Sequence, residues 1–319
     1  MNFSDAFGLG ISGHRDIDFA DIRLDTDTSL YIDPERILLS DHPVAISAST
    51  SINDFFETVC SAASYHDTAA LYSLLSSGRE PNETHLGLSS GYSRGRGTSA
   101  EILLPIVENM IKLGLFERQL ITQLSDFHLW TPNFGYDRLS DLTTNIIRAH
   151  LYDYTLEQFS YWNIVGFDTT PRILPTWDSV NHCWAVHRYN YPCFGSYDIL
   201  LVPKEFIGPS MLSTPGELLQ KYALSFRQQE HLIENSPLCH TKERKTGRID
   251  LLPPTKRELR QIEIGGQPSK PYMLEIGYRH PEMVRQLHFD HYQSNRRSTI
   301  VMEDYQLDQA FYGDSADVI

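Results

Sequence analysis

The 319-residue chain lacks the sequence features of membrane-spanning, secreted and disulfide-bonded proteins. It has no run of about 18 apolar residues, the length that a transmembrane helix needs. Its N-terminus lacks the basic start and apolar run of a secretory signal. Its four cysteines form no CxxC pair, which indicates free thiols rather than a disulfide framework. These absences predict a cytoplasmic protein that does not engage a membrane.

Basic residues are also scarce, because 27 Lys and Arg stand against 41 Asp and Glu, a net charge of -14. General nucleic-acid binding draws on clustered Lys and Arg, so this balance excludes it. A nucleic acid or a nucleotide would have to bind through a local site: a basic patch, a metal ion or a partner subunit. We also expect a protein partner or a homo-oligomer.

The expected fold class is α/β or α+β, with a helix-rich N-terminal half packed on a mixed β-sheet supplied mainly by residues 160–205. Residues 1–233 are expected to form this core and 234–270 a charged, proline-containing linker or arm. Residues 271–319 would bind a partner or pack on the core. Apolar periodicity predicts helices from Ser51, over Thr68–Leu75, from Ser99 to Gly114, over Ser140–Tyr161 and over Pro215–His231, and strands over Ser29–Ile32, Cys183–Arg188 and Asp198–Val202.

The most informative stretch begins at Gly135 and opens the helix over Ser140–Tyr161. Asp137, Asp141, Asn145 and Arg148 recur there at helical spacing, so they form one stripe. Carboxylate and amide oxygens suit a hard cation such as Mg²⁺, and a guanidinium suits a phosphate. The stripe therefore predicts a metal and phosphate site, although acids near a helix start also simply stabilise the helix.

A glycine-rich and arginine-rich loop over residues 85–99 leads into the helix that starts near Ser99. Glycines let backbone amides converge on an anion, and Arg94, Arg96 and Thr98 supply a clamp and a hydroxyl. The loop lacks the Gly-Lys-Ser/Thr of a Walker A motif. It predicts phosphate binding, with a flexible solvated loop as the alternative.

Two further positions suggest catalysis. Glu83 and His85 alternate, so on a strand they share a face and could bind metal or transfer a proton. Turn chemistry explains the same stretch equally well. Lys204 ends the apolar run Asp198–Val202, as a lysine does in restriction-type nuclease cores. The acid expected two residues before it is Val202, so a plain strand-end charge is the alternative.

Two weaker patterns lie in the second half of the chain. Four potential zinc ligands gather in sequence, but the two cysteines are ten residues apart and adjacent strand positions point to opposite faces. An arginine and a histidine also stand at a spacing seen in small helical ribonucleases, a spacing that recurs by chance. The residues are His182, Cys183, His187 and Cys193 for zinc, and Arg285 and His291 for the ribonuclease spacing.

The segments Glu80–Arg96, Asp137–Thr155 and Leu200–Lys204 resemble a group of uncharacterised bacterial proteins of mobile elements and phage-defence loci. The resemblance covers about half of the chain through three short blocks. It implies a bacterial cytoplasmic protein that serves as a subunit of a defence system. It implies no catalytic residue.

The leading hypothesis is a metal-dependent phosphodiester hydrolase, nuclease-like, in a bacterial anti-phage defence system, with Mg²⁺ as the expected cation. The alternatives are a non-enzymatic sensor or scaffold subunit of a defence complex, and a nucleotide- or second-messenger-binding module. In the leading hypothesis the metal ligands are Asp137, Asp141 and Asn145 or Glu83, the phosphate is held by Arg94, Arg96, Thr98 and Arg148, and Lys204 positions the attacking water.

Overall fold

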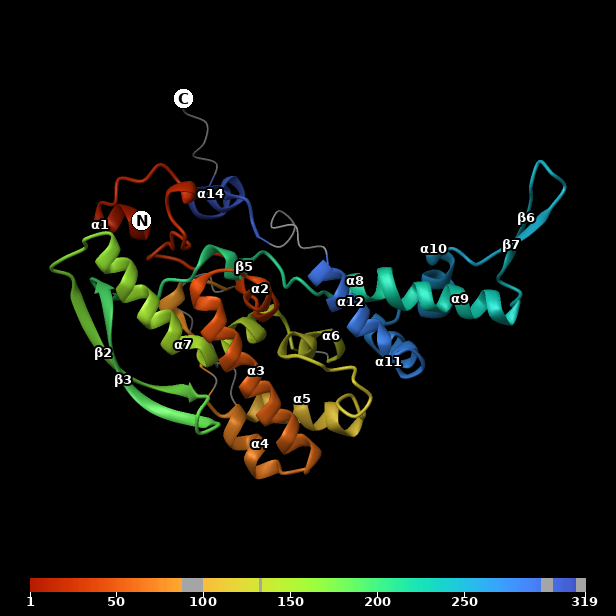
Figure 1. Ribbon diagram of the computed structural model, residues 1–319, viewed down its shortest axis with the longest axis horizontal. Helices are drawn as coiled ribbons and strands as arrows, with labels where there is room; N and C mark the ends of the chain where they lie inside the picture. Colours follow the sequence, from red (N-terminus) through yellow and green to blue (C-terminus); the bar gives the residue numbers. More distant parts are fainter. Residues whose placement is uncertain (78, 88–99, 132–133, 294–300, 314–319) are drawn as a thin grey trace.

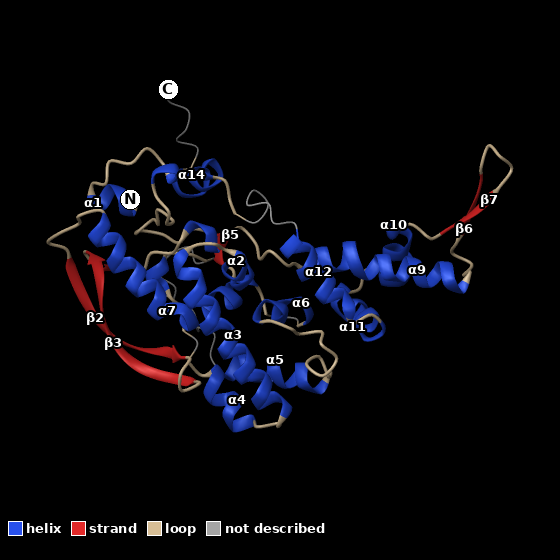
Figure 2. Ribbon diagram, viewed as in Figure 1, coloured by secondary structure: helices blue, strands red, loops and turns tan. Residues whose placement is uncertain are grey.

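A computed structural model describes residues 1–77, 79–87, 100–131, 134–293 and 301–313 (Figure 1). Helices predominate and the strands form small antiparallel sheets, which confirms a mixed α/β fold (Figure 2). The molecule has a broad helical body and a narrower arm that extends from one side of it. Within the described ranges, none of the helices combines the length and the apolar character needed to cross a bilayer.

The body is built around helix α7 (Tyr136–Tyr161), which packs against α3 (Pro43–Ser64) and the strand β2 (Asp168–Asp178). Five further helices belong to the body. They are α1 (Phe3–Phe7), α2 (Pro34–Leu39), α4 (Thr68–Leu75), α5 (Ala100–Lys112) and α6 (Phe127–Trp130).

Helix α3 begins eight residues before the predicted start at Ser51. Pro43 occupies its first turn, and the side chain of His42 accepts a hydrogen bond from the backbone N–H of Val44. Ser51 is buried in the middle of the helix, where its hydroxyl lies 2.9 Å from His150 Nε2 of α7. The prediction of a cap at Ser51 was wrong because a proline at the first turn with a histidine cap supplies an equally good start.

Helix α7 also starts earlier than predicted, at Tyr136 rather than Ser140. Ser140 is buried, and its hydroxyl accepts a hydrogen bond from the backbone N–H of Ile32 at 2.9 Å. Thr143, Thr144 and Thr155 are buried as well, and each hydroxyl donates to the carbonyl four residues earlier. Polar residues on this helix therefore face the core with their hydrogen bonds satisfied within the fold.

A long hairpin of β2 (Asp168–Asp178) and β3 (Cys183–Phe194) covers one side of the body, and β4 (Tyr197–Asp198) adds a short third strand. All pairs are antiparallel, so the sheet is not mixed as expected. The predicted strand Asp198–Val202 pairs only through Asp198. The rest is buried. Ile199 N still donates to Pro192 O of β3 at 2.9 Å, but Leu200 N donates to Glu83 O at 2.8 Å, outside the sheet.

A short ladder fixes the start of α2. Strand β1 (Tyr31–Ile32) pairs antiparallel with β5 (Ile207–Gly208), and Asp33 follows at once as the cap of α2. One carboxylate oxygen of Asp33 accepts from Glu35 N at 2.9 Å and the other from Leu212 N at 2.6 Å. The ladder and this carboxylate hold Glu35 beside the segment that leads into the arm.

The arm begins with α8 (Pro215–Glu217), a π-helical turn η5 (Leu218–Ala223) and α9 (Leu224–Glu234), which form one continuous rod (Figure 1). A hairpin of β6 (His240–Glu243) and β7 (Ile249–Leu252) projects from its far end. The chain then returns through α10 (Lys256–Leu259), η6 (Arg260–Ile264), α11 (Ser269–Arg279) and α12 (Glu282–Gln293). Helix α14 (Asp304–Tyr312) packs back on η1 (His14–Asp16).

Candidate metal centre

Three residues of the predicted sites meet in one buried ion-pair network rather than in an open site. Arg148 is fully buried, its Nη1 bonds Glu83 Oε1, and its Nη2 donates to Asn145 Oδ1 at 2.7 Å. The Asn145 amide donates to the backbone carbonyls of Arg79 and Asp141. Because the side-chain oxygen of Asn145 accepts from the guanidinium of Arg148, and Arg148 also bonds Glu83, these three side chains are engaged with one another, and their predicted roles at a metal and phosphate site stay predictions.

The two aspartates of the stripe lie on the same helix, N-terminal to Asn145 and Arg148. Asp137 is half-buried beside Gly87, where a Cβ atom would come within 3.1 Å of Asp137 Oδ1. Asp137 also lies near Asp27, whose pKa is raised to about 6 by burial first and then by the charges of Glu80 and Asp137. Asp141 is half-buried and contributes its backbone carbonyl to Asn145. Among the described residues, neither aspartate belongs to a group of three His, Cys, Asp or Glu side chains whose ligand atoms lie within 4.8 Å of one another.

Lys204 is committed to a structural contact. Its Nζ donates to His14 O at 2.6 Å and pairs with Asp304 Oδ1 at 2.7 Å, so it ties α14 to the N-terminal segment. Its predicted role in positioning the attacking water stays a prediction. The predicted phosphate ligands Arg94, Arg96 and Thr98 lie outside the described residues, whereas Gly87, in the described first part of that loop, lies against the carboxylate of Asp137.

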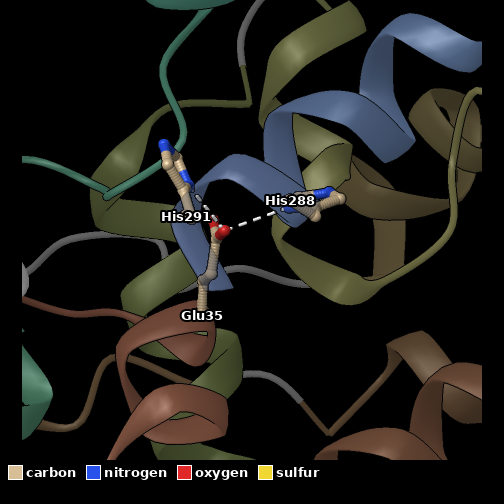
Figure 3. Close-up of side chains that lie close together, drawn as sticks. All are labelled: Glu35, His288 and His291. Carbon is tan, nitrogen blue, oxygen red and sulfur yellow. Dashed lines mark hydrogen bonds and ion pairs between the residues drawn. The ribbon is translucent and has the colours of Figure 1, made fainter. Parts of the chain in front are cut away.

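The strongest constellation lies where the arm meets the body. Glu35 of α2 points at His288 and His291 of α12, which stand one helical turn apart (Figure 3). Both Nδ1 atoms converge on Glu35 Oε1, at 3.0 Å for His288 and 2.8 Å for His291. Across the described ranges this is the one group of three His, Cys, Asp or Glu side chains whose ligand atoms all lie within 4.8 Å.

Further carboxylates hold the outer nitrogens of both imidazoles. His288 Nε2 lies 2.7 Å from Asp126 Oδ1, and His291 Nε2 lies 3.3 Å from Glu217 Oε2. The hydroxyl of Ser213 donates to Glu35 Oε2 at 2.5 Å, which leaves Oε1 to face the histidines. Each of the three converging groups is therefore oriented from behind by a second polar group.

The amide of Gln123 adds a donor to the centre. Its Nε2 lies 3.1 Å from His288 Nδ1, and its side-chain oxygen accepts from the backbone at the N-terminus of the turn over Leu124–Asp126. That backbone bond fixes which end of the amide faces the imidazole. His288 Nδ1 thus lies near an acceptor, the carboxylate of Glu35, and a donor, the amide of Gln123. It can donate to Glu35 when it carries a proton and accept from Gln123 when it does not.

The site is nearly closed to solvent, because Glu35 is 3% exposed and the side chains of His288 and His291 are 16% and 12% exposed. Burial lowers the pKa of His288, but the carboxylates of Asp126 and Glu35 outweigh it and raise this pKa to about 10. Glu217 and Glu35 likewise outweigh burial and raise the pKa of His291 to about 9. Burial would raise the pKa of Glu35, but the two histidines hold it well below its usual range.

The donor set fits a metal ion on the evidence of these contacts. Two nitrogens and one carboxylate oxygen converge, and the outer N–H of each imidazole is directed to a carboxylate, the arrangement that frees the inner nitrogen to bind a metal. Three protein ligands with two imidazoles suit Zn²⁺ or Fe²⁺ better than Mg²⁺, which prefers oxygen. Three ligands leave positions for water.

Sequence reasoning missed most of this centre. His291 was singled out, but with Arg285, whose exposed guanidinium instead donates to Gln119 Oε1 at 2.9 Å. The usable signal was His288 and His291 at i and i+3 on one helix, a common arrangement for two metal ligands. Nothing in the sequence joined that pair to Glu35, more than 250 positions away. The zinc alternative at His182, Cys183, His187 and Cys193 is not a ligand cluster among the described residues.

Comparison with known proteins places the chain in a family, but the family has no assigned activity. Residues 8–213 match the family model described as a domain of unknown function, DUF8370. The match includes Glu35, Asp126 and Ser213 and ends before Glu217, His288 and His291. Neither a curated protein nor a solved structure matches the chain. The candidate centre therefore joins a carboxylate of the family domain to two histidines of the arm that follows it.

Proposed function

The chain belongs to the DUF8370 family, and we propose that it is a metal-dependent hydrolase with its centre at Glu35, His288 and His291. Phosphodiesters of nucleic acid are the proposed substrate, and the proposed setting is cytoplasmic bacterial defence. The observation that carries the proposal is the convergence of both Nδ1 atoms on Glu35 Oε1 while both Nε2 atoms face carboxylates.

The chemistry of the centre follows from its ligands. A zinc-type ion held by three protein groups supplies a Lewis acid and a water of lowered pKa. Asp126 and Glu217 fix the orientation of the imidazoles, and Ser213 fixes the carboxylate of Glu35.

The contacts also support a second candidate function, a scaffold in which five side chains form a latch that holds the arm to the body. They are Glu35, Asp126, Glu217, His288 and His291. Two imidazolium groups between three carboxylates hold the arm to the body without a metal, because each charge already has a partner. This candidate predicts that metal ions leave the stability of the protein unchanged and that the protein cleaves no phosphodiester.

Metal titration with thermal unfolding separates the two. We expect Zn²⁺ at 100 times its dissociation constant to stabilise the wild-type chain by about 2.7 kcal/mol. The double variant His288→Asn, His291→Asn should show no such gain. A matched control, His66→Asn with His187→Asn, removes two exposed histidines elsewhere and should keep it.

Cleavage of labelled DNA and RNA with each of Zn²⁺, Mn²⁺, Fe²⁺ and Mg²⁺ completes the test. The hydrolase predicts cleavage that needs both a metal and the histidine pair. Stabilisation by zinc without cleavage under any of these metals would reject the hydrolase and leave a structural metal site. Absence of both effects would support the latch.

A further inference from the structure

The hairpin β6–β7 projects from the far end of the arm, away from the body (Figure 1; Figure 2). Its register pairs His240 with Leu252 and Glu243 with Ile249. The loop closes with Arg244 N donating to Arg248 O at 2.7 Å, and Gly247 supplies the positive φ of 77° that this turn requires. Residues 241–249 are all exposed, so the hairpin has no core of its own.

The hairpin region is the basic part of an acidic protein. Residues 240–260 hold seven Lys or Arg and three Asp or Glu, a net charge of +4, whereas the whole chain carries -14. Arg244 and Arg248 share one carboxylate, Asp250, at 2.5 Å and 3.1 Å. The side chains of Lys242 and Lys245 form neither a hydrogen bond nor an ion pair with any residue in the described ranges. The tip therefore offers positive charge to a partner.

An isolated two-stranded hairpin is marginally stable in water. At the base of this hairpin, His240 Nε2 lies 3.1 Å from Glu258 of α10. Its marginal stability, full exposure and positive charge are together typical of a segment that is completed by binding an anionic partner.

We propose that the hairpin β6–β7 binds duplex DNA in the major groove. That groove, about 12 Å wide, admits a two-stranded β-ribbon. Arg244 and Arg248, aligned by Asp250, face the base edges, and Lys242 and Lys245 contact phosphates. The major groove of duplex RNA is too deep and narrow for such a ribbon, so DNA is the partner. The inference rests on the proposed function in taking nucleic acid as the substrate.

Side-chain contacts brace the helices of the arm against one another. Glu263 accepts from Arg227 Nε and Nη2 and from the hydroxyl of Tyr272, which ties η6 to α9 and α11. Glu230 of α9 bonds Arg279 of α11. The rod over residues 218–234 is about 25 Å long, which corresponds to roughly seven base pairs of DNA. A bound duplex can thus reach from the hairpin towards α12.

Fluorescence anisotropy with a labelled duplex of roughly 20 base pairs, about two helical turns, tests the binding. A chelator is present, so no cleavage occurs. Lys242→Gln with Lys245→Gln should weaken binding roughly 10- to 100-fold at 0.1 M salt and make the salt dependence shallower by about two in log–log slope. The control Arg15→Gln with Lys112→Gln removes two exposed charges from the body and should bind as the wild type does.

Three outcomes would overturn the inference: no binding of duplex DNA, equal or tighter binding of duplex RNA, or equal weakening in both double variants. Far-ultraviolet circular dichroism of each variant verifies that it is folded. If the wild-type chain binds through the hairpin but cleaves nothing with any metal, the proposed function fails while this inference stands. If it cleaves DNA and the hairpin variant binds and cleaves equally well, the inference fails and the proposed function stands.

Discussion

Arg148 is the largest of the fully buried side chains in the described part of the chain. Its guanidinium meets Glu83, Asn145 and the hydroxyl of Tyr191, while its Nε has no hydrogen-bond partner among the described residues. Burial lowers the pKa of Arg148, but a guanidinium stays charged, so the network must supply the negative charge. Glu83 supplies it.

Removing the negative charge of Glu83 should destabilise the protein. We expect Glu83→Gln to lower the free energy of unfolding by about 3–5 kcal/mol, because it leaves Arg148 buried and uncompensated. Adding Arg148→Met should recover most of the loss, since the uncompensated charge is then gone. Urea denaturation of the two single variants and the double variant measures the coupling.

Glu275→Gln is the matched control, because Glu275 pairs with Arg279 on an exposed helix face. It should cost at most about 1 kcal/mol. If Glu83→Gln costs no more than this control, Glu83 and Arg148 do not form the buried pair described here.

At the scale of elements, helix α14 shows how a short helix is fixed by its neighbours. Its buried residues Leu307 and Phe311 pack against the body, and Phe311 lies against the ring of His14. Lys204 adds an ion pair to Asp304, and the imidazole of His14 adds a hydrogen bond to Asp308. A helix of nine residues is marginal alone, so these tertiary contacts hold it.

We expect Phe311→Ala to destabilise the protein by about 3–5 kcal/mol, the usual cost of emptying a buried phenylalanine site. Tyr305→Ala on the same helix should change stability by less than about 0.5 kcal/mol, because Tyr305 is 67% exposed. Thermal or denaturant unfolding compares the two. Similar losses in both variants would mean that α14 does not dock through Phe311.

Short-range sequence signals predicted the positions of many helices. Thr68–Leu75 was predicted with its observed bounds, and the helices over 99–114 and 215–231 were placed within a few residues. Their signals are short-range: an aspartate cap at residue 67, a proline in a first turn and a regular apolar face. The segment Ile199–Val202 misled the same reasoning, because an apolar run indicates burial but does not supply a strand partner.

At the scale of the molecule, the arm meets the body through groups that titrate. Glu35 and Asp126 belong to the body, and His288, His291 and Glu217 belong to the arm. The histidines have a usual pKa of 6.5 and folded values of about 10 and 9. Their contribution to stability is therefore complete below pH 6.5 and is lost as the pH rises through 9 to 10. The Glu35 contribution has the opposite sign, since it is present above pH 4.5 and lost in acid.

In a chelator, we expect the free energy of unfolding to fall between about pH 6.5 and 10. Urea denaturation across this window measures it, with His288→Asn, His291→Asn as the comparison, and the variant should show a flatter dependence. Added metal should reverse this fall in stability with rising pH. A metal binds the unprotonated imidazoles, so it binds more tightly as the pH rises. If the stability of the wild type and of the double variant changed with pH in the same way, His288 and His291 would not be the groups that cause the pH dependence.

The sequence by itself determined the class of fold, most helices and the location of the basic arm, because these follow from composition and from contacts within a few residues of one another. It also marked Asp137, Asn145, Arg148 and Glu83 as unusual. Only the tertiary structure decided that Arg148 and Asn145 point inward to Glu83, and that Glu35 meets His288 and His291. Which charge faces which depends on how distant segments pack, and the spacing of residues along one chain carries no record of that packing.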